Sequence, residues 1–175
     1  RHDGQWHQRQ VGILDGRLGF TIGPSVPEDV AMNGMKDGYG PSAEGTVLEH
    51  CPQAGLVIAA LARQVAQHGG AILIIDYGRD GNPGDSLQAV ADHKPVDIFH
   101  APGHSDLSHW VDFAALEKAA SAAGARLVPP VPQGQFLMRI GLAARAEQAG
   151  KMAAPKTRRA LLAAIDRLTS PEQMG

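Results

Sequence analysis

The sequence predicts an α/β fold, and three stretches support that prediction. Residues 49–68 have the spacing of an amphipathic helix, and Gly69-Gly70 follow as its exit. The next five residues, Ala71 to Ile75, are all apolar, as in a strand that is buried on both faces of a sheet. Residues 6–22 hold two β-leaning runs around Asp15-Gly16, which predicts a β-hairpin. Helix, glycine pair and strand together resemble one step of a doubly wound sheet.

The composition is that of an ordinary globular domain. The 175 residues are 43% hydrophobic and 19% charged, with a formal net charge of -2. This balance gives no reason to expect a nucleic-acid partner, which needs a clustered basic face. No apolar run approaches the roughly 20 residues of a membrane span. The single cysteine, Cys51, excludes an internal disulfide and fits a reducing compartment. Since the first residue is not Met, we expect a piece of a longer protein.

Local signals place the other elements of the amino-terminal two thirds of the chain. Residues 23–47 are rich in Gly, Pro and polar side chains, which predicts a long, partly mobile excursion. Residues 79–111 predict a long polar loop with one helical turn at 85–92. A helix is expected from Asp112, as its N-cap, to Gly124 just past its end.

The last fifty residues predict two strands and two helices. Residues 126–128 and 136–142 predict short strands that could pair at a sheet edge, where the prolines between them are tolerated. Residues 143–149 and 155–168 predict helices, the second of them basic and amphipathic.

Asp76, Tyr77 and Gly78 directly follow the predicted buried strand. In open α/β sheets, ligands bind outside the carboxyl ends of the strands, so the sheet would aim these residues at a crevice. Asp76 could orient an amine or hydroxyl there, and Tyr77 could stack on a ligand or hydrogen-bond with it. Gly78 would let the backbone turn and approach closely. The alternative is that Asp76 only caps the following loop through its own backbone.

Four histidines lie within 17 residues, at positions 93, 100, 104 and 109. Their spacing fits no closed zinc site and the stretch has no Cys, so we expect no metal. His109 is a candidate acid-base or substrate-binding group, and Asp106 either caps its loop or joins it. No GxGxxG, GxxxxGK[ST] or GxSxG motif occurs, and we interpret the Gly-rich residues 78–85 as a flexible loop.

Four motifs in order along the chain resemble one known family. They are GGAILIIDYG (69–78), GDSLQAV (84–90), PGHSDLSHWVDFAAL (102–116) and QGQFLMRIGLAAR (133–145). They resemble the carboxyl half of the MidA family, the S-adenosylmethionine-dependent methyltransferases of bacteria and mitochondria, over about residues 5–175. The resemblance implies the carboxyl-terminal part of a Rossmann-like class I methyltransferase domain with an inserted β-hairpin.

The resemblance also implies a partial domain. The inserted hairpin and loop would occupy residues 1–48, the second half of the α/β sheet 49–142, and the carboxyl-terminal helices 143–175. The family's Gly-rich cofactor loop would lie amino-terminal to residue 1, so we expect this chain alone to be inactive. A sheet without its first strands exposes an apolar face, which the rest of the protein or a second copy in a homodimer could cover.

The activity that the resemblance implies is transfer of a methyl group from S-adenosylmethionine to a protein arginine. Asp76 would hold the guanidinium by paired hydrogen bonds, with Asp106 and His109 also catalytic. Tyr77 and Gly78 would contact the cofactor. The protein substrate would be a subunit such as one of respiratory complex I, in the mitochondria of a eukaryote or the cytoplasm of a bacterium.

Two other functions stay open at this point. The chain could be a non-catalytic binding or assembly module for a respiratory-complex subunit. It could also be a metal hydrolase that uses the histidines at 93–109.

Overall fold

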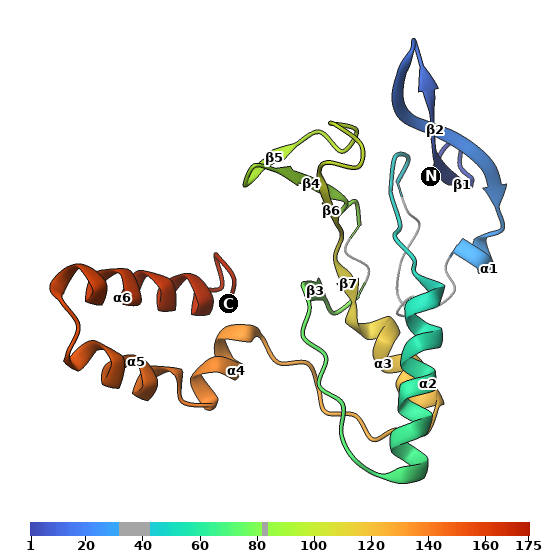
Figure 1. Cartoon of the computed structure of the whole chain (residues 1–175). Coiled ribbons are helices and arrows are strands. Elements are labelled where there is room, and N and C mark those ends of the chain that lie inside the picture. Colours follow the sequence, from blue (N-terminus) through green and yellow to red (C-terminus); the bar gives the residue numbers. More distant parts are fainter. Residues whose placement is uncertain (32–42, 82–83) are drawn as a thin grey trace. The chain divides into compact units, whose positions relative to one another are not determined.

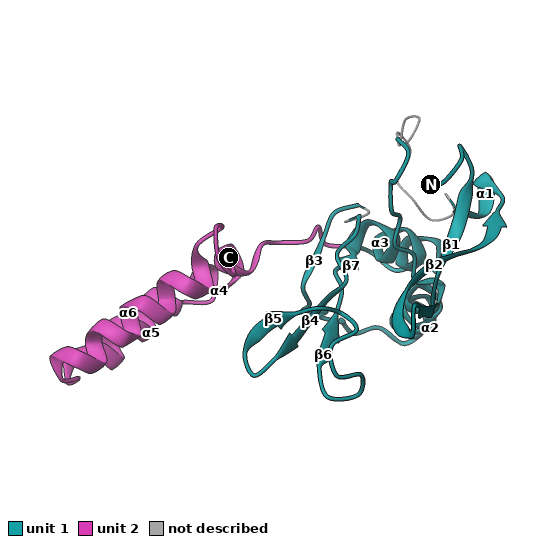
Figure 2. Ribbon diagram, turned by 90° about the horizontal axis from the view of Figure 1, so that it is seen from above, with its two compact units in different colours: residues 1–127 teal, residues 128–175 magenta. Residues whose placement is uncertain are grey.

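The computed structural model describes residues 1–31, 43–81 and 84–175, which form two compact units (Figure 2). The first unit, residues 1–127, mixes strands and helices, and the second, residues 128–175, is helical. Much of the predicted excursion, at 32–42, and two residues of the predicted Gly-rich loop, at 82–83, lie outside the described residues.

The elements of the first unit are shown in Figure 1. They are β1 (Trp6–Leu14), β2 (Arg17–Val26), α1 (Glu28–Ala31), α2 (Pro52–His68), β3 (Gly78–Arg79), β4 (Gln88–Ala91), β5 (Lys94–Val96), β6 (Asp106–Ser108), β7 (Val111–Asp112) and α3 (Phe113–Ala122).

The predicted hairpin is present as β1 and β2. The two strands pair antiparallel, with Val11 opposite Phe20, and the second strand continues to Val26. Asp15 and Gly16 join them with φ values of 49° and 76°. Positive φ at both central residues is the condition for the tight turn that matches the twist of paired strands.

The two predicted helices of the first unit are also confirmed. Pro52 occupies the first turn of α2, where its missing N–H costs nothing. Asp112 caps α3, because its carboxylate accepts the Ala115 N–H at 3.1 Å. The two helices pack against each other (Figure 1), and each buries one alanine, Ala62 in α2 and Ala120 in α3.

The predicted buried strand at Ala71 to Ile75 is wrong for the described residues. The segment is an irregular return from α2 to β3, and its four large side chains are 42 to 71% exposed. A strand needs a neighbour for its backbone N–H and C=O groups. None of the described strands pairs with this segment, so its apolar side chains face solvent.

The predicted loop at 79–111 is wrong in part, because it contains several short strands. Strands β5, β4 and β6 form an antiparallel sheet in that order, and β3 pairs parallel with β7. No helical turn forms at 85–92, since Gln88–Ala91 is β4 and buries Ala89. The turn after it uses Asp92 and His93 at φ 49° and 61°, a conformation that the sequence pattern does not reveal.

The second unit contains α4 (Gln133–Arg139), α5 (Leu142–Lys151) and α6 (Pro155–Thr169). The last two confirm the predicted helices. The predicted strands at 126–128 and 136–142 are wrong: the first is irregular, and the second falls in α4 and the start of α5. Short apolar runs do not distinguish a strand from a helix by periodicity. At the start of α4, the Gln133 side-chain amide donates to the Leu168 and Met174 carbonyls and ties this helix to the end of α6.

Candidate functional site

The pairing of β3 with β7 brings two of the predicted site stretches together. Gly78 lies opposite Val111, and the Val111 N–H donates to the Tyr77 carbonyl at 2.8 Å. Tyr77 and Gly78 therefore run beside the residues that follow His109. The stretches are more than 30 positions apart in the sequence, and the strand pair is what makes them neighbours.

Asp76 lies at the entrance to this strand pair with its side chain exposed. One carboxylate oxygen accepts the Tyr77 N–H at 2.8 Å, which is the local contact of the capping alternative. The same contact fixes the direction of the carboxylate. Tyr77 is 67% exposed, so its ring is accessible to a ligand.

Gly78 has a packing reason to be glycine. A Cβ at this position would lie 2.7 Å from the Phe113 ring and closer still to the Val111 carbonyl oxygen. Atoms cannot approach that closely, so β3 can meet β7 and the start of α3 only without a side chain there. The cofactor role of Gly78 stays a prediction, and this contact gives it a second, structural role.

The other two predicted catalytic residues lie on either side of a strand boundary. Asp106 is exposed on β6, where it pairs with Val90 in the three-stranded sheet. His109 is exposed just before β7, and its Nδ1 lies 3.0 Å from the Trp110 carbonyl oxygen. Their catalytic roles also stay predictions.

A hydrogen-bonded group that no sequence pattern indicates lies beside this site. The Ser86 hydroxyl donates to the Glu49 carboxylate at 2.5 Å and accepts the backbone N–H of Trp110 at 2.9 Å. The guanidinium of Arg79 stacks on the Trp110 ring, 3.8 Å from its centroid. A pocket of about 310 Å³ is lined by Arg79, Asp85, Ser86, Leu87, Gln88 and Trp110. Ser86 and Glu49 are 37 positions apart, and no local pattern indicates that they meet.

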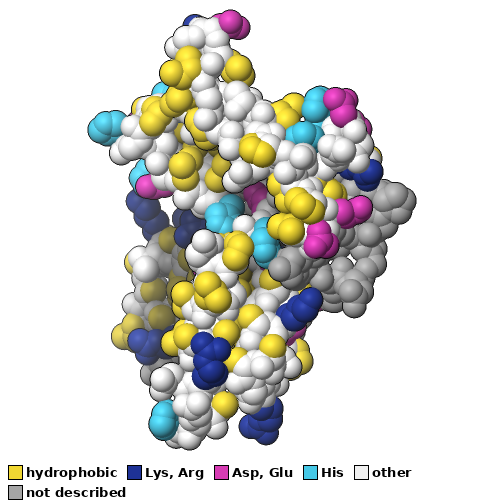
Figure 3. All heavy atoms as spheres, turned by 90° about the vertical axis from the view of Figure 1, so that its right-hand side faces the viewer, with side chains coloured by type: hydrophobic (Ala, Val, Ile, Leu, Met, Phe, Trp, Pro, Cys, Tyr) yellow, Lys and Arg dark blue, Asp and Glu magenta, His cyan; other side chains and the backbone are white. Residues whose placement is uncertain are grey.

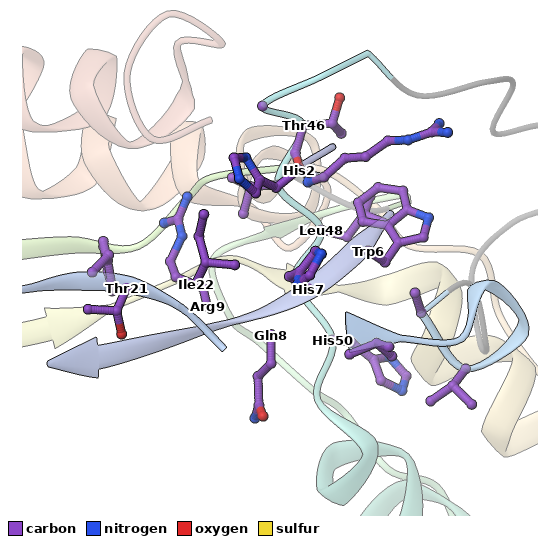
Figure 4. A pocket seen from close by; sticks show the side chains of 17 residues that line it. His2, Trp6, His7, Gln8, Arg9, Thr21, Ile22, Thr46, Leu48 and His50 are labelled. Carbon is purple, nitrogen blue, oxygen red and sulfur yellow. Dashed lines mark hydrogen bonds between the residues drawn. The ribbon is translucent and has the colours of Figure 1, made fainter. Parts of the chain in front are cut away.

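A larger cleft lies away from these residues, beside the β1–β2 hairpin (Figure 4). It has a volume of about 730 Å³, and none of the five predicted site residues lines it. His2, His7 and His50 are among the side chains around it, with Trp6 and Leu48 (Figure 4). On the face shown in Figure 3, histidine side chains lie among apolar and charged ones. A ligand site combines a concave surface with a few converging polar groups, so we place the candidate site at the β3–β7 pair, where predicted site residues and the Ser86 hydrogen bonds lie.

The structure does not gather the histidines of 93–109 into a ligand group. Among the described residues, His2, Asp3 and Glu44 are the three that offer ligand atoms within 4.8 Å of one another, and all are exposed. The Glu44 carboxylate already accepts the N–H groups of Asp3 at 2.7 Å and Gly4 at 3.3 Å. The Gly4 hydrogen bond is the main cause that lowers the pKa of Glu44. This group therefore holds the turn at the start of the described chain.

The family assignment comes from comparison with known proteins. A model of the S-adenosyl-L-methionine-dependent methyltransferase family matches residues 1–131. The chain belongs to this family. The family's cofactor is S-adenosylmethionine, and its methyltransferase chemistry agrees with the resemblance of the four motifs.

Two relatives within the family show how much of a longer protein the chain represents. Human mitochondrial protein arginine methyltransferase NDUFAF7 is 39% identical over 129 residues, which cover 73% of this chain and 29% of the human protein. The protein of the same name from Xenopus laevis is 33% identical over 174 residues, covering 97% of this chain and 38% of that protein. The chain thus spans well under half the length of these relatives.

A solved structure confirms that the chain shares an α/β fold. A crystal structure from Burkholderia thailandensis, bound to S-adenosyl-homocysteine, matches 99% of this chain with a TM-score of 0.70 and 22% identity. The match covers 46% of that chain. In the described parts of the present chain, no helix is both long enough and apolar enough to cross a membrane.

Proposed function

We propose that the protein containing this chain methylates an arginine of another protein, and that this chain supplies the substrate side of the site. The β3–β7 pair carries the proposal, because it places Tyr77 and Gly78 beside the residues after His109. The names of the two relatives, both protein arginine methyltransferases, support the choice of arginine. We assign the chain to the carboxyl-terminal part of a Rossmann-like domain, with β1–β2 as an insertion.

The reaction needs positioning more than covalent help from the protein. A guanidinium nitrogen forms a bond to the methyl carbon as the bond from that carbon to sulfur breaks. The sulfur would keep the electron pair of the broken bond, and the nitrogen would lose one proton to water. A carboxylate that pairs with two guanidinium N–H groups fixes the attacking nitrogen. Asp76 is exposed and held in one direction, which suits this role, and Asp106 and His109 would line the same side.

In this proposal, Tyr77 and Gly78 form part of the cofactor site. S-adenosylmethionine supplies an electrophilic methyl group when bound. The exposed Tyr77 ring could contact it, while Gly78 would shape the backbone, since its α-carbon faces Phe113 and Val111. The chain contains no GxGxxG motif to cradle the cofactor. We therefore expect the isolated chain to bind S-adenosylmethionine weakly or not at all.

The proposed setting rests on the relatives, and the proposed substrate on the family resemblance of the four motifs. We propose a protein substrate such as a subunit of respiratory complex I, and mitochondria as the site of action if the source is a eukaryote, because the relatives are mitochondrial. In a bacterium the protein would act in the cytoplasm. The exposed segment at 71–75 would be covered by the rest of the protein or, in a homodimer, by a second copy.

The test is a methyl-transfer assay with the protein that contains this chain. Methyl-labelled S-adenosylmethionine is incubated with the protein and an extract of cells that lack its gene, so that the natural substrate is unmethylated. Acid hydrolysis should release labelled methylarginine. Label in another amino acid would disprove the arginine assignment. Tight binding of a respiratory-complex subunit without any transfer would favour the assembly module instead.

A further inference from the structure

Ser86 joins three segments that are distant in the sequence. Its backbone N–H donates to Glu49 at 3.1 Å, and its hydroxyl donates to the other oxygen of the same carboxylate at 2.5 Å. The hydroxyl also accepts the backbone N–H of Trp110 at 2.9 Å. A hydroxyl has one proton to donate and lone pairs to accept with, so this arrangement satisfies both functions. All three residues are partly buried, which strengthens such bonds relative to exposed ones.

The group acts on the candidate site through Trp110. The Trp110 N–H is held by Ser86, and the next residue, Val111, begins the pairing with Tyr77 and Gly78. The preceding residue is His109. The Trp110 ring supports the Arg79 guanidinium, which lies on β3 directly after Gly78. The carboxylate of Glu49 is thus connected, through one hydroxyl, to both strands of the site.

Glu49 is well placed to serve as the fixed end of this connection. It lies just before α2, which packs against α3, and α3 begins directly after β7. Its carboxylate, through Ser86, therefore fixes the position of Trp110 relative to the α2–α3 helix pair. A hydrogen bond to a charged acceptor holds its partners more strongly than a neutral one.

We propose that Glu49 and Ser86 are positioning residues of the methyl-transfer site, which hold His109 to Val111 against Tyr77 to Arg79. This inference rests on the proposed function. Neither side chain needs to touch the substrate. Loss of the connection would let the two strands shift, and a misplacement of about 1 Å in such a site can cost roughly a hundredfold in rate.

The experiment compares Ser86→Ala with Ser86→Thr, which keeps a hydroxyl, in the whole protein. Ser170→Ala is the matched control, because the Ser170 hydroxyl also donates to a carboxylate, that of Glu172, at 2.5 Å, in the second unit. We expect Ser86→Ala to lower kcat about tenfold to a hundredfold, with the KM for S-adenosylmethionine changed little. Ser86→Thr should recover most of the rate, and Ser170→Ala should leave it unchanged. Glu49→Gln should resemble Ser86→Ala and replaces it if the latter does not fold.

Amide hydrogen exchange provides a second measurement that does not depend on activity. Residues 109–112 should exchange faster in Ser86→Ala than in the wild type or in Ser170→Ala. Unchanged exchange there, or a normal kcat in a variant that is only less heat-stable, would overturn the positioning role while leaving methyl transfer intact. If the wild type transfers no methyl group, the proposed function fails, and the exchange of 109–112 alone decides whether the connection exists.

Discussion

Arg9 and Asp85 form a two-bond ion pair, with nitrogen-to-oxygen distances of 2.9 and 3.1 Å, across 76 positions of sequence. Arg9 also stacks on Phe20, and the Phe20 ring meets the Phe99 ring edge-on with 5.0 Å between centroids. The β1–β2 hairpin is thereby attached to the segment that precedes β4 and to the one that follows β5.

The Arg9–Asp85 pair should contribute little to global stability and more to the position of the hairpin. Both side chains are partly exposed, at 34% and 53%, so a double-mutant cycle with Arg9→Gln and Asp85→Asn should give a coupling of about 0.2–1 kcal/mol. The coupling should fall as salt is raised. The exposed pair of Lys151 and Glu147 is the control, with a coupling at the low end. A coupling that is zero at low salt would contradict the attachment.

Gly78→Ala should destabilise the protein, and Gly55→Ala should not. The new methyl at position 78 would press on the Val111 backbone and the Phe113 ring, and such overpacking costs about 1–3 kcal/mol. At position 55, inside α2, the nearest atom would be the Ala119 Cβ at 3.9 Å, an ordinary contact. Helix propensity then favours alanine by roughly 0.5–1 kcal/mol. Urea unfolding measures both changes, and shifts of the same sign would refute the packing argument.

Asp76→Asn should lower turnover without unfolding the turn. Asparagine keeps the oxygen that accepts the Tyr77 N–H, so the melting temperature should stay close to that of the wild type. It loses the charge that would pair with a guanidinium, which should reduce kcat about tenfold to a hundredfold. Asp97→Asn is a matched control, since Asp97 accepts the Phe99 N–H at 2.8 Å in a similar local contact. Normal activity in Asp76→Asn would remove this residue from the site.

The turn at Asp3 and Gly4 should loosen in acid. Hydrogen bonds from Gly4 and Asp3 lower the pKa of Glu44, so its folded-state pKa lies below the unfolded value. The stabilisation is then present above the unfolded pKa and is lost as the pH falls through the folded one. The amide signals of Asp3 and Gly4 in an NMR titration should follow this loss. Glu44→Gln should abolish the pH dependence, and its persistence in that variant would assign it to another group.

The hairpin and most helices could be predicted because their signals are local. Asp15-Gly16 specifies a turn by itself, and Asp112 caps α3 from three residues away. The predictions at 71–75 and, in part, at 79–111 were wrong because the structure of these segments depends on residues distant in the sequence. Ala71 to Ile75 has the composition of a buried strand, but a strand also needs a neighbour, which the described residues do not supply. The β4–β5 pair depends on the turn at Asp92 and His93, whereas the β4–β6 and β3–β7 pairs join residues that are far apart in the sequence.

The candidate site also combines features that local sequence indicates with features that depend on distant partners. That Asp76 to Gly78 would share a site with Asp106 and His109 was expected only through the family resemblance. The β3–β7 pairing, which no local pattern indicates, is what places Tyr77 and Gly78 beside the residues that follow His109. Glu49 and Ser86 were missed, because a glutamate before a helix and a serine in a polar stretch are individually unremarkable. Only their contact across 37 positions gives them significance.

The exposed return from α2 to β3 also bears on how the polypeptide behaves outside its native setting. Ala71 to Ile75 is uncharged and free of proline, the composition of segments that stack into intermolecular β-structure. Gly70 and the negative charge of Asp76 flank it and act as gatekeepers against such self-association. Asp76 would therefore keep the chain soluble while it is being made, in addition to any part in chemistry, and its replacement by an apolar residue should show first as precipitation.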